Sequence, residues 1–217
     1  NYNILRSNNG GQSWTPTLNI FTESTIVNSA RVYGFIGYSY EQYSFVGANA
    51  GSFLYYSNNY GETWHKVNSY IGLSNIKITG IYVTPTTTLS GQNGIRVFII
   101  FIDLNDLDRP NINFFDIPYS TIENSLIDIP IAENNIRNLS DHPYYYNSFK
   151  NFRAIDGYGD NVFALGKKKD SNLDGILITE KTLYTNSNSR ISYFDVSLND
   201  IAAASPHIVI AVGENTL

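Results

Sequence analysis

Apolar residues recur along the chain in short runs, and turns rich in Asn, Gly and Ser separate these runs. Runs of about four to eight residues dominated by Ile, Val, Tyr and Phe are typical of β-strands. Four pairs of runs have the spacing of antiparallel hairpins: residues 32–37 with 43–49, 76–82 with 95–102, 152–157 with 161–166, and 201–204 with 208–213. The pattern therefore predicts an all-β chain.

A second set of apolar runs alternates with these hairpins. It comprises residues 2–14 with the segment directly after them, 53–67, 111–131 and 176–196. An inner hairpin followed by an outer pair predicts a four-stranded antiparallel unit that repeats. Helical patterns are short and are found only at 120–126, where Ser120 and Glu123 have the spacing of a capping box, and at 197–204. We interpret both as connections between units.

The clearest internal repeat supports this unit. Residues 7–14 (SNNGGQSW) and 57–64 (SNNYGETW) lie 50 positions apart, and each follows a strand-like run. Five positions are identical: Ser7 and Ser57, Asn8 and Asn58, Asn9 and Asn59, Gly11 and Gly61, and Trp14 and Trp64. Asn and Gly supply the positive φ angles of a tight turn, side-chain oxygens bind the turn backbone, and Trp folds back as an apolar plug. We predict that both Trp rings are at least half buried.

The two octapeptides resemble the Asp-box, or BNR repeat, of sialidase-like β-propellers. That motif reads S-x-D-x-G-x-T-W and lies between the third and fourth strands of a blade. Asn9 and Asn59 stand where the family usually has Asp, so the turn-forming acceptor is kept and the charge is lost. The resemblance implies a β-propeller of four-stranded blades, and it implies little chemistry because the box lies away from the active face.

The two ends of the chain fit this repeat head to tail, with an outer strand at residues 2–6 and an inner strand at 208–212. One interpretation is a single propeller domain over residues 1–217. Its four blades are 200–217 with 1–14, 15–68, 69–145 and 146–199, and it predicts that 2–6 pairs with 208–212 to close the ring. The alternative is a window on a six- or seven-bladed propeller.

Composition narrows the functional classes. Only 15% of the 217 residues are charged and the formal net charge is −5, so the basic face that nucleic-acid binding requires is not expected. The chain has no Cys, which excludes disulfides, thiolate metal sites and thiol nucleophiles. The longest apolar run, 97–102, is far shorter than the roughly 20 residues of a membrane-spanning helix, so we expect no membrane span.

Polarity carried by uncharged side chains suits an exported protein, and we expect an extracellular, cell-surface or virion location. The chain begins at Asn1 and contains no Met, so we expect a processed product, an excised domain or the ordered part of something longer.

Three loops carry candidate binding residues. The first contains Asp103, Asn105, Asp106 and Asp108, whose oxygens suit Ca²⁺ but lack the Gly and terminal Glu of an EF-hand loop, so a solvated acidic turn is the alternative. The second is a basic turn that suits an acidic glycan or partner surface, or is a solvated tip: Lys167, Lys168 and Lys169. Apart from calcium we expect no cofactor.

The third loop contains three consecutive aromatic residues after His142 and Pro143: Tyr144, Tyr145 and Tyr146. Tyr rings with a polar edge suit contacts with sugars or proteins, and packing beneath the loop is the alternative. Asn138 opens a glycosylation sequon just before this loop, which matters only in a glycosylating pathway.

The enzymatic alternative is a sialidase-like glycoside hydrolase. That family uses three arginines to bind a carboxylate, a Tyr activated by Glu as nucleophile, and an Asp as acid. Arg31, Arg96 and Arg153 lie on three predicted inner strands, and residues 152–155 (FRAI) are similar to the family's FRIP strand without its Pro. No Tyr and Glu pair can be assigned, and arginines on inner strands commonly pair with carboxylates such as Asp156.

Other hydrolase motifs are absent from the sequence, and three His residues are too scattered for a zinc spacing: His65, His142 and His207. The sequence thus favours a non-catalytic attachment or assembly module over a glycoside hydrolase.

Overall fold

The computed structural model describes residues 3–19, 35–48, 54–68, 76–88, 91–124, 129–130, 137–138, 147–159, 161–171, 173–179 and 190–214. These residues are mostly β-strand and include the short helix α1 (Tyr119–Asn124). The all-β prediction is therefore confirmed.

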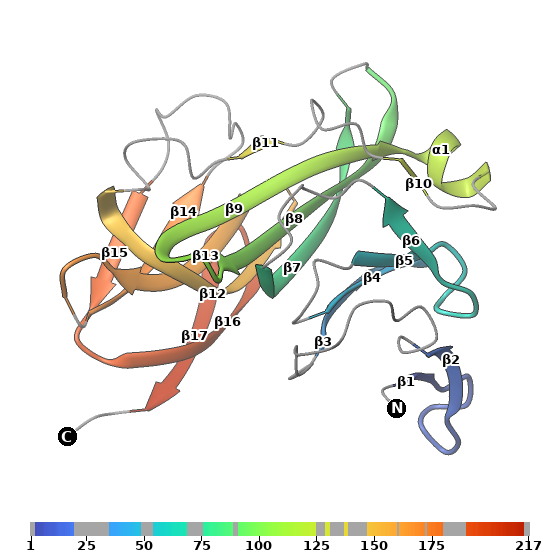
Figure 1. Cartoon of the computed structure of the whole chain (residues 1–217), viewed down its shortest axis with the longest axis horizontal. Helices are drawn as coiled ribbons and strands as arrows, with labels where there is room; N and C mark the ends of the chain where they lie inside the picture. The colour runs from blue at the N-terminus through green and yellow to red at the C-terminus, as the bar shows by residue number, and fades with distance from the viewer. Residues whose placement is uncertain are drawn as a thin grey trace.

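The described strands form three larger sheets flanked by two hairpins (Figure 1). The N-terminal hairpin is β1 (Asn3–Arg6) with β2 (Thr15–Asn19). Sheet A, in spatial order, is β10 (Ile129–Pro130), β6 (His65–Asn68), β5 (Leu54–Ser57), β4 (Tyr43–Ala48) and β3 (Phe35–Tyr40). Sheet B is β11 (Arg137–Asn138), β9 (Asp106–Pro118), β8 (Asn93–Asp103) and β7 (Ile76–Thr87). Sheet C is β12 (Phe149–Tyr158), β13 (Asn161–Lys168), β14 (Asp174–Thr179) and β15 (Arg190–Phe194). The C-terminal hairpin is β16 (Ser197–Ser205) with β17 (Ile208–Glu214). Neighbouring strands are antiparallel except β10, which joins β6 in parallel.

The sheets stack face to face through their first strands. β3 contacts β7, β12 contacts β7, β8 and β9, and β16 contacts β12 and β13. Three buried clusters fill the spaces between successive layers. Sheet strands buried on both faces read as continuous apolar runs, which is why residues 97–102 show no alternation.

Each cluster draws on two layers. The first joins sheets A and B and contains Phe45, Tyr56, Ile78 and Phe101. The second joins sheets B and C around Phe98, Phe114, Phe149 and Phe152. The third joins sheet C to the C-terminal hairpin around Phe163, Leu165, Leu198 and Ile201.

Glycines allow the layers to approach closely. A Cβ on Gly47 of sheet A would lie 2.8 Å from the Ile78 side chain of sheet B. A Cβ on Gly80 of sheet B would lie 2.7 Å from Ile155 of sheet C. Both separations are shorter than any side chain tolerates, so we expect bulkier residues at these positions to push the sheets apart.

The four predicted inner hairpins are confirmed as β3–β4, β7–β8, β12–β13 and β16–β17, in the parts the structure describes. The predicted helix at 120–126 corresponds to α1. The helical candidate at 197–204 is wrong because these residues form β16, where the chain pairs with β17. The outer pair predicted at 111–131 is replaced by β9, α1 and β10, and β10 crosses to sheet A.

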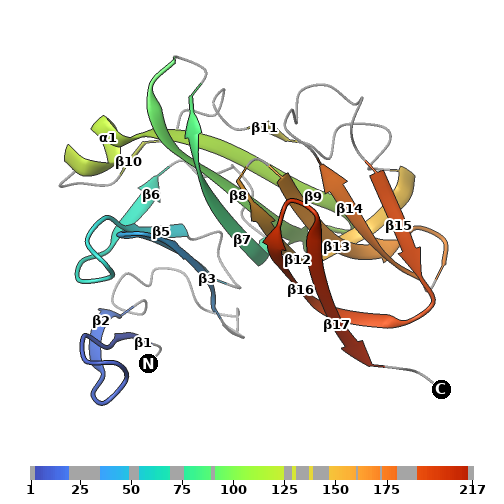
Figure 2. The same cartoon turned by 180° about the vertical axis from the view of Figure 1, so that it is seen from behind.

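The predicted pairing of residues 2–6 with 208–212 is wrong in the described part of that range. β1 pairs with β2, and β17 pairs with β16. Strands β1 and β17 lie well apart in both views (Figures 1 and 2). Hydrogen bonds and ion pairs of side chains hold each terminal hairpin on its neighbouring layer, so the described sheets form an open stack and not a closed ring.

Candidate binding site

The two repeated octapeptides, called here the first turn (residues 7–14) and the second turn (residues 57–64), adopt the same hydrogen-bond pattern. Ser7 Oγ accepts from the backbone N–H of Gly11 at 2.7 Å, and Asn9 Oδ1 accepts from the N–H of Ser13 at 2.9 Å. Asn9 Nδ2 donates to Ser13 Oγ at 2.8 Å. Three short polar side chains therefore satisfy the turn backbone locally.

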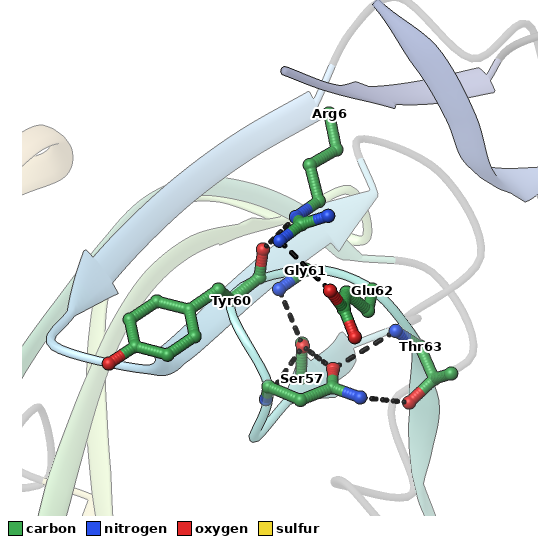
Figure 3. Close-up of polar contacts among 7 residues, drawn as sticks. Arg6, Ser57, Tyr60, Gly61, Glu62 and Thr63 are labelled. Carbon is green, nitrogen blue, oxygen red and sulfur yellow. Dashed lines mark hydrogen bonds and ion pairs between the residues drawn. The ribbon is translucent and has the colours of Figure 1, made fainter. Parts of the chain in front are cut away.

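The second turn repeats each of these contacts. Ser57 Oγ accepts from Gly61 N–H at 2.9 Å, Asn59 Oδ1 accepts from Thr63 N–H at 3.0 Å, and Asn59 Nδ2 donates to Thr63 Oγ1 at 2.9 Å (Figure 3). Gly11 and Gly61 have φ angles of 87° and 77°, which explains why both turns have glycine there. The repeat seen in the sequence is thus a repeat of structure.

The surroundings of the two turns differ. The second turn receives the N-terminal hairpin: Arg6 Nε donates to the carbonyl of Tyr60 at 2.7 Å, and Arg6 Nη2 lies 3.1 Å from Glu62 (Figure 3). Trp64 Nε1 donates to Thr17 Oγ1 of β2 at 3.1 Å. The second turn is therefore a docking surface for another part of the chain.

The second turn is also tied to α1. Asn58 Nδ2 donates to the carbonyl of Ile122 at 2.7 Å, and Tyr60 N–H donates to the carbonyl of Gln42 at 3.0 Å. Ser57 is completely buried, whereas Ser7 is half-buried.

The first turn lacks such a cover among the described residues. Trp14 is 60% exposed, and its Nε1 donates within its own turn to the Gly11 carbonyl at 3.1 Å. The prediction that both Trp rings are at least half buried is confirmed for Trp64, which is partly buried, and wrong for Trp14. The turn fixes where the ring lies, but another layer is needed to bury it.

A groove of about 340 Å³ lies between the N-terminal hairpin and sheet A. Strand β1 and Trp14 form one wall, and β3 and β4 with Ser44 and Val46 form the other. Tyr60 and Trp64 of the second turn also line it. Aromatic rings beside hydroxyl and backbone groups make this groove suitable for contact with a sugar or a polypeptide.

The two described arginines of the sialidase hypothesis are both engaged in ion pairs. Arg96 binds Asp116 through two hydrogen bonds of 2.6 and 2.8 Å and lies over the Phe114 ring. Arg153 pairs with fully buried Asp174, and its guanidinium also donates to the carbonyl of Leu198. Arg31 lies outside the described residues. Both described guanidinium groups therefore already contact a carboxylate of the chain itself.

Arg153, Asp174 and Asp156 hold the C-terminal hairpin on sheet C. Asp174 Oδ2 accepts from the N–H of Leu198 at 2.6 Å, and Asp156 Oδ2 accepts from the N–H of Ala203 at 2.8 Å. The expected partner of Arg153 was a carboxylate such as Asp156, and the pairing observed is with Asp174. The carboxylates of Asp174 and Asp156 therefore accept hydrogen bonds from the backbone of β16.

A Tyr and Glu pair that the sequence did not reveal lies beside α1. Tyr43 Oη donates to Glu123 Oε1 at 2.9 Å and accepts from Gln42 Nε2 at 3.0 Å. Burial, followed by the hydrogen bond to Glu123, raises the pKa of Tyr43 to about 12, so the phenol keeps its proton. A nucleophilic Tyr needs the opposite shift. Tyr43 also belongs to the first core, whereas Arg96 lies over Phe114 of the second core, on the other face of sheet B.

The structure brings the predicted acidic loop and the basic turn together. Lys150 Nζ lies 2.8 Å from Asp108, and both line a polar cleft with Lys169, Asp170 and Ser171. Lys168, the last residue of β13, has its Nζ 4.7 Å from the centre of the Tyr193 ring on β15 of the same sheet. Nothing in the sequence pattern singles out Lys150, because its role depends on the turn from another sheet.

The acidic loop does not gather a metal site within the described ranges. Asp103 Oδ1 accepts from the N–H of Asn105 at 2.8 Å, and Asp103 pairs with Asp106 across the β8–β9 turn. No group of three or more His, Asp or Glu side chains suited to a metal ion occurs among the residues described. The carboxylate of Asp103 thus shapes the turn.

Several predicted residues lie outside the described part: Tyr144, Tyr145, Tyr146 and His142. Their role stays a prediction. Asn138 lies in β11. His65 packs against the Tyr56 ring at a centroid distance of 5.3 Å, and the backbone N–H of His207 donates to Ser205 Oγ.

No protein-family model matches the chain, and no curated protein matches it in sequence, so the Asp-box resemblance rests on the two turns themselves. None of the helices described is long and apolar enough to cross a membrane.

Proposed function

We propose that this chain is a non-catalytic attachment or assembly module of the β-propeller type, exposed on a cell, virion or appendage. Its blades are the stacked antiparallel sheets, and its contact site is the groove between the N-terminal hairpin and sheet A. The observation that carries this proposal is the exposed Trp14, which lines that groove together with Trp64. The low charge and the abundance of uncharged polar residues support the location.

The polar groups that would make an enzyme of this type have other roles. Arg96 and Arg153 neutralise buried or partly buried carboxylates, and Tyr43 has a raised pKa. The proposed function uses no cofactor. The predicted contacts of Tyr144 to Tyr146 and Lys167 to Lys169 with a partner remain part of it.

The groove is tested by Trp14→Ala with Leu107→Ala as the matched control, because Leu107 is 56% exposed on a different layer. Glycan-array binding and self-association are measured on the same preparations. If the protein binds a glycan or self-associates, we expect Trp14→Ala to weaken that affinity by at least about tenfold, as is usual when an aromatic residue is removed from the centre of a contact site. Equal behaviour of both variants and the wild type would contradict the groove as the contact site.

The alternative, a sialidase-like glycoside hydrolase, is tested with a fluorogenic sialoside. We expect no turnover above the buffer control. Turnover that disappears in Arg96→Ala, with the fold retained by circular dichroism, would replace this proposal by the enzymatic one.

A further inference from the structure

The N-terminal and C-terminal hairpins each form a two-stranded sheet, whereas sheets A, B and C have four or five strands. In sheets A and C an inner hairpin is followed by an outer pair, and the join is antiparallel: β4 with β5, and β13 with β14. Among the described strands, the C-terminal hairpin corresponds to the inner hairpin of such a sheet, and the N-terminal hairpin corresponds to the outer pair. Among the described strands, β17 pairs only with β16 and β1 only with β2.

One face of β17 is packed against the core and the other is exposed to solvent. Val209 and Ala211 pack against the third core. The alternate residues Ile208, Ile210 and Val212 are 57%, 57% and 55% exposed. An unpaired edge with an aliphatic row is a template for pairing with another strand.

In each earlier layer the face that looks away from the N-terminal hairpin is covered by the next layer. Phe45 of sheet A meets sheet B, Phe98 of sheet B meets sheet C, and Leu165 of sheet C meets the C-terminal hairpin. The row on β17 is the same face at the end of the stack, and the described residues place nothing on it.

The groove at the other end of the stack has the matching features. Residues of β1 line it, and Leu5 there is 50% exposed. The opposite wall is the face of β3 and β4 that carries Gly37, Ser44 and Val46, which is the uncovered side of sheet A.

We infer that β17 of one copy pairs antiparallel with β1 of a second copy and completes a four-stranded sheet in its groove. Ile208, Ile210 and Val212 then face β3 and β4 of the second copy. This inference rests on the proposed function and names a second copy of the chain as the partner of the groove. The contact is head to tail, so it builds rings or filaments and not a two-fold dimer.

A second copy is the partner favoured by the molecule itself. Among the described strands, the N-terminal hairpin supplies the kind of strand pair that the C-terminal hairpin lacks, and β1 and β17 lie well apart in both views (Figures 1 and 2). Arg6 fixes the N-terminal hairpin on the second turn, and Arg153, Asp174 and Asp156 fix the C-terminal hairpin on sheet C. These contacts fix the position of each hairpin, so that β1 and β17 of one chain stay apart and their unpaired edges remain available to a second copy.

The test uses two blocked variants and their mixture. Leu5→Lys blocks the groove end, and Ile210→Lys blocks the β17 end. Both positions are at least half exposed, so the fold tolerates them. Leu107→Lys, at an equally exposed position, is the control. Circular dichroism and melting temperature verify the fold, and light scattering after size exclusion measures the mass.

We expect the wild type and Leu107→Lys to exceed the monomer mass of 24.4 kDa increasingly with concentration. Each blocked variant alone stays at the monomer mass. Their equimolar mixture forms a dimer of twice that mass and no larger species, because one variant retains the strand and the other the groove.

Wild type that stays monomeric at all concentrations, or a mixture that does not dimerise, would overturn the inference. Self-association that both blocked variants retain would overturn it as well. Failure of the proposed function is a separate result, since it would appear as sialoside turnover by the monomeric variants. Glycan binding that depends on Trp14 without any self-association would keep the proposed function and remove the second copy as its partner.

Discussion

The first and second turns share their internal hydrogen bonds and differ in what covers them. Trp64 donates to Thr17 of the docked hairpin, whereas Trp14 donates to its own turn and is 60% exposed. The comparison separates two levels of structure. Short polar side chains fix the turn locally, and the neighbouring layer decides whether the turn buries its Trp. The same motif is thus a structural joint at one position and an open contact surface at the other.

The largest expected difference between the turns is in their Trp residues. Trp64→Ala removes the ring that joins the second turn to β2, and we expect it to lower the free energy of unfolding by about 2–3 kcal/mol. Trp14→Ala should lower it by less than about 0.5 kcal/mol, because the ring is mostly in water. Urea denaturation of both variants measures the two values. Equal losses would mean that the turns are equally buried.

The serine that opens each turn gives the next largest difference. Ser57→Ala leaves the N–H of Gly61 without its acceptor in a buried position, which should cost about 1–2 kcal/mol. Water can replace the lost acceptor in Ser7→Ala, so a loss below about 0.5 kcal/mol is expected there. Ser7→Ala acts as the matched control in the same denaturation series. A larger loss for Ser7→Ala would reverse the assignment of the buried turn.

The contact with α1 distinguishes the turns by a smaller amount. Asn58→Ala removes the hydrogen bond to the Ile122 carbonyl and should cost about 1 kcal/mol. Asn8, at the matching position, is exposed, and Asn8→Ala should change the unfolding free energy by a few tenths of a kcal/mol at most. Hydrogen exchange of α1 amides in the two variants shows whether the helix loosens only in Asn58→Ala.

The smallest effect is expected where the two turns are alike. In Asn9→Asp and Asn59→Asp the new carboxylate still accepts the backbone N–H of Ser13 or Thr63. The hydroxyl of that residue, which accepts a hydrogen bond from the Asn amide in the wild type, donates one to the carboxylate in the variant. We expect each change to stay within about 0.5 kcal/mol and to be the same in both turns. A large loss in only one turn would show that their internal geometry is not equivalent.

The sequence predicted the features that depend on neighbouring residues. The spacing of the apolar runs and the composition of the turns located the inner hairpins and both repeated turns, because a strand pair and a polar turn are encoded within about 20 residues. The short helix at 119–124 followed from its cap spacing.

Long-range contacts could not be predicted in the same way. The exposure of Trp14, the pairing of Arg153 with Asp174, and the crossing of β10 to sheet A all depend on which layer lies beside each residue. The prediction that β1 and β17 pair within one chain was wrong, because each of these strands pairs with its neighbour in the sequence.

The most direct test of the open first turn as a contact surface is the concentration dependence of the indole N–H signals in ¹⁵N-correlated NMR. The chain has two Trp residues, so two signals are expected, and Trp14→Ala assigns them. We predict that the Trp14 signal shifts and gains protection from solvent exchange as the protein concentration rises, while the Trp64 signal stays constant. A Trp14 signal that is unchanged over the full concentration range, or a Trp64 signal that moves in its place, would contradict the first turn as the contact surface.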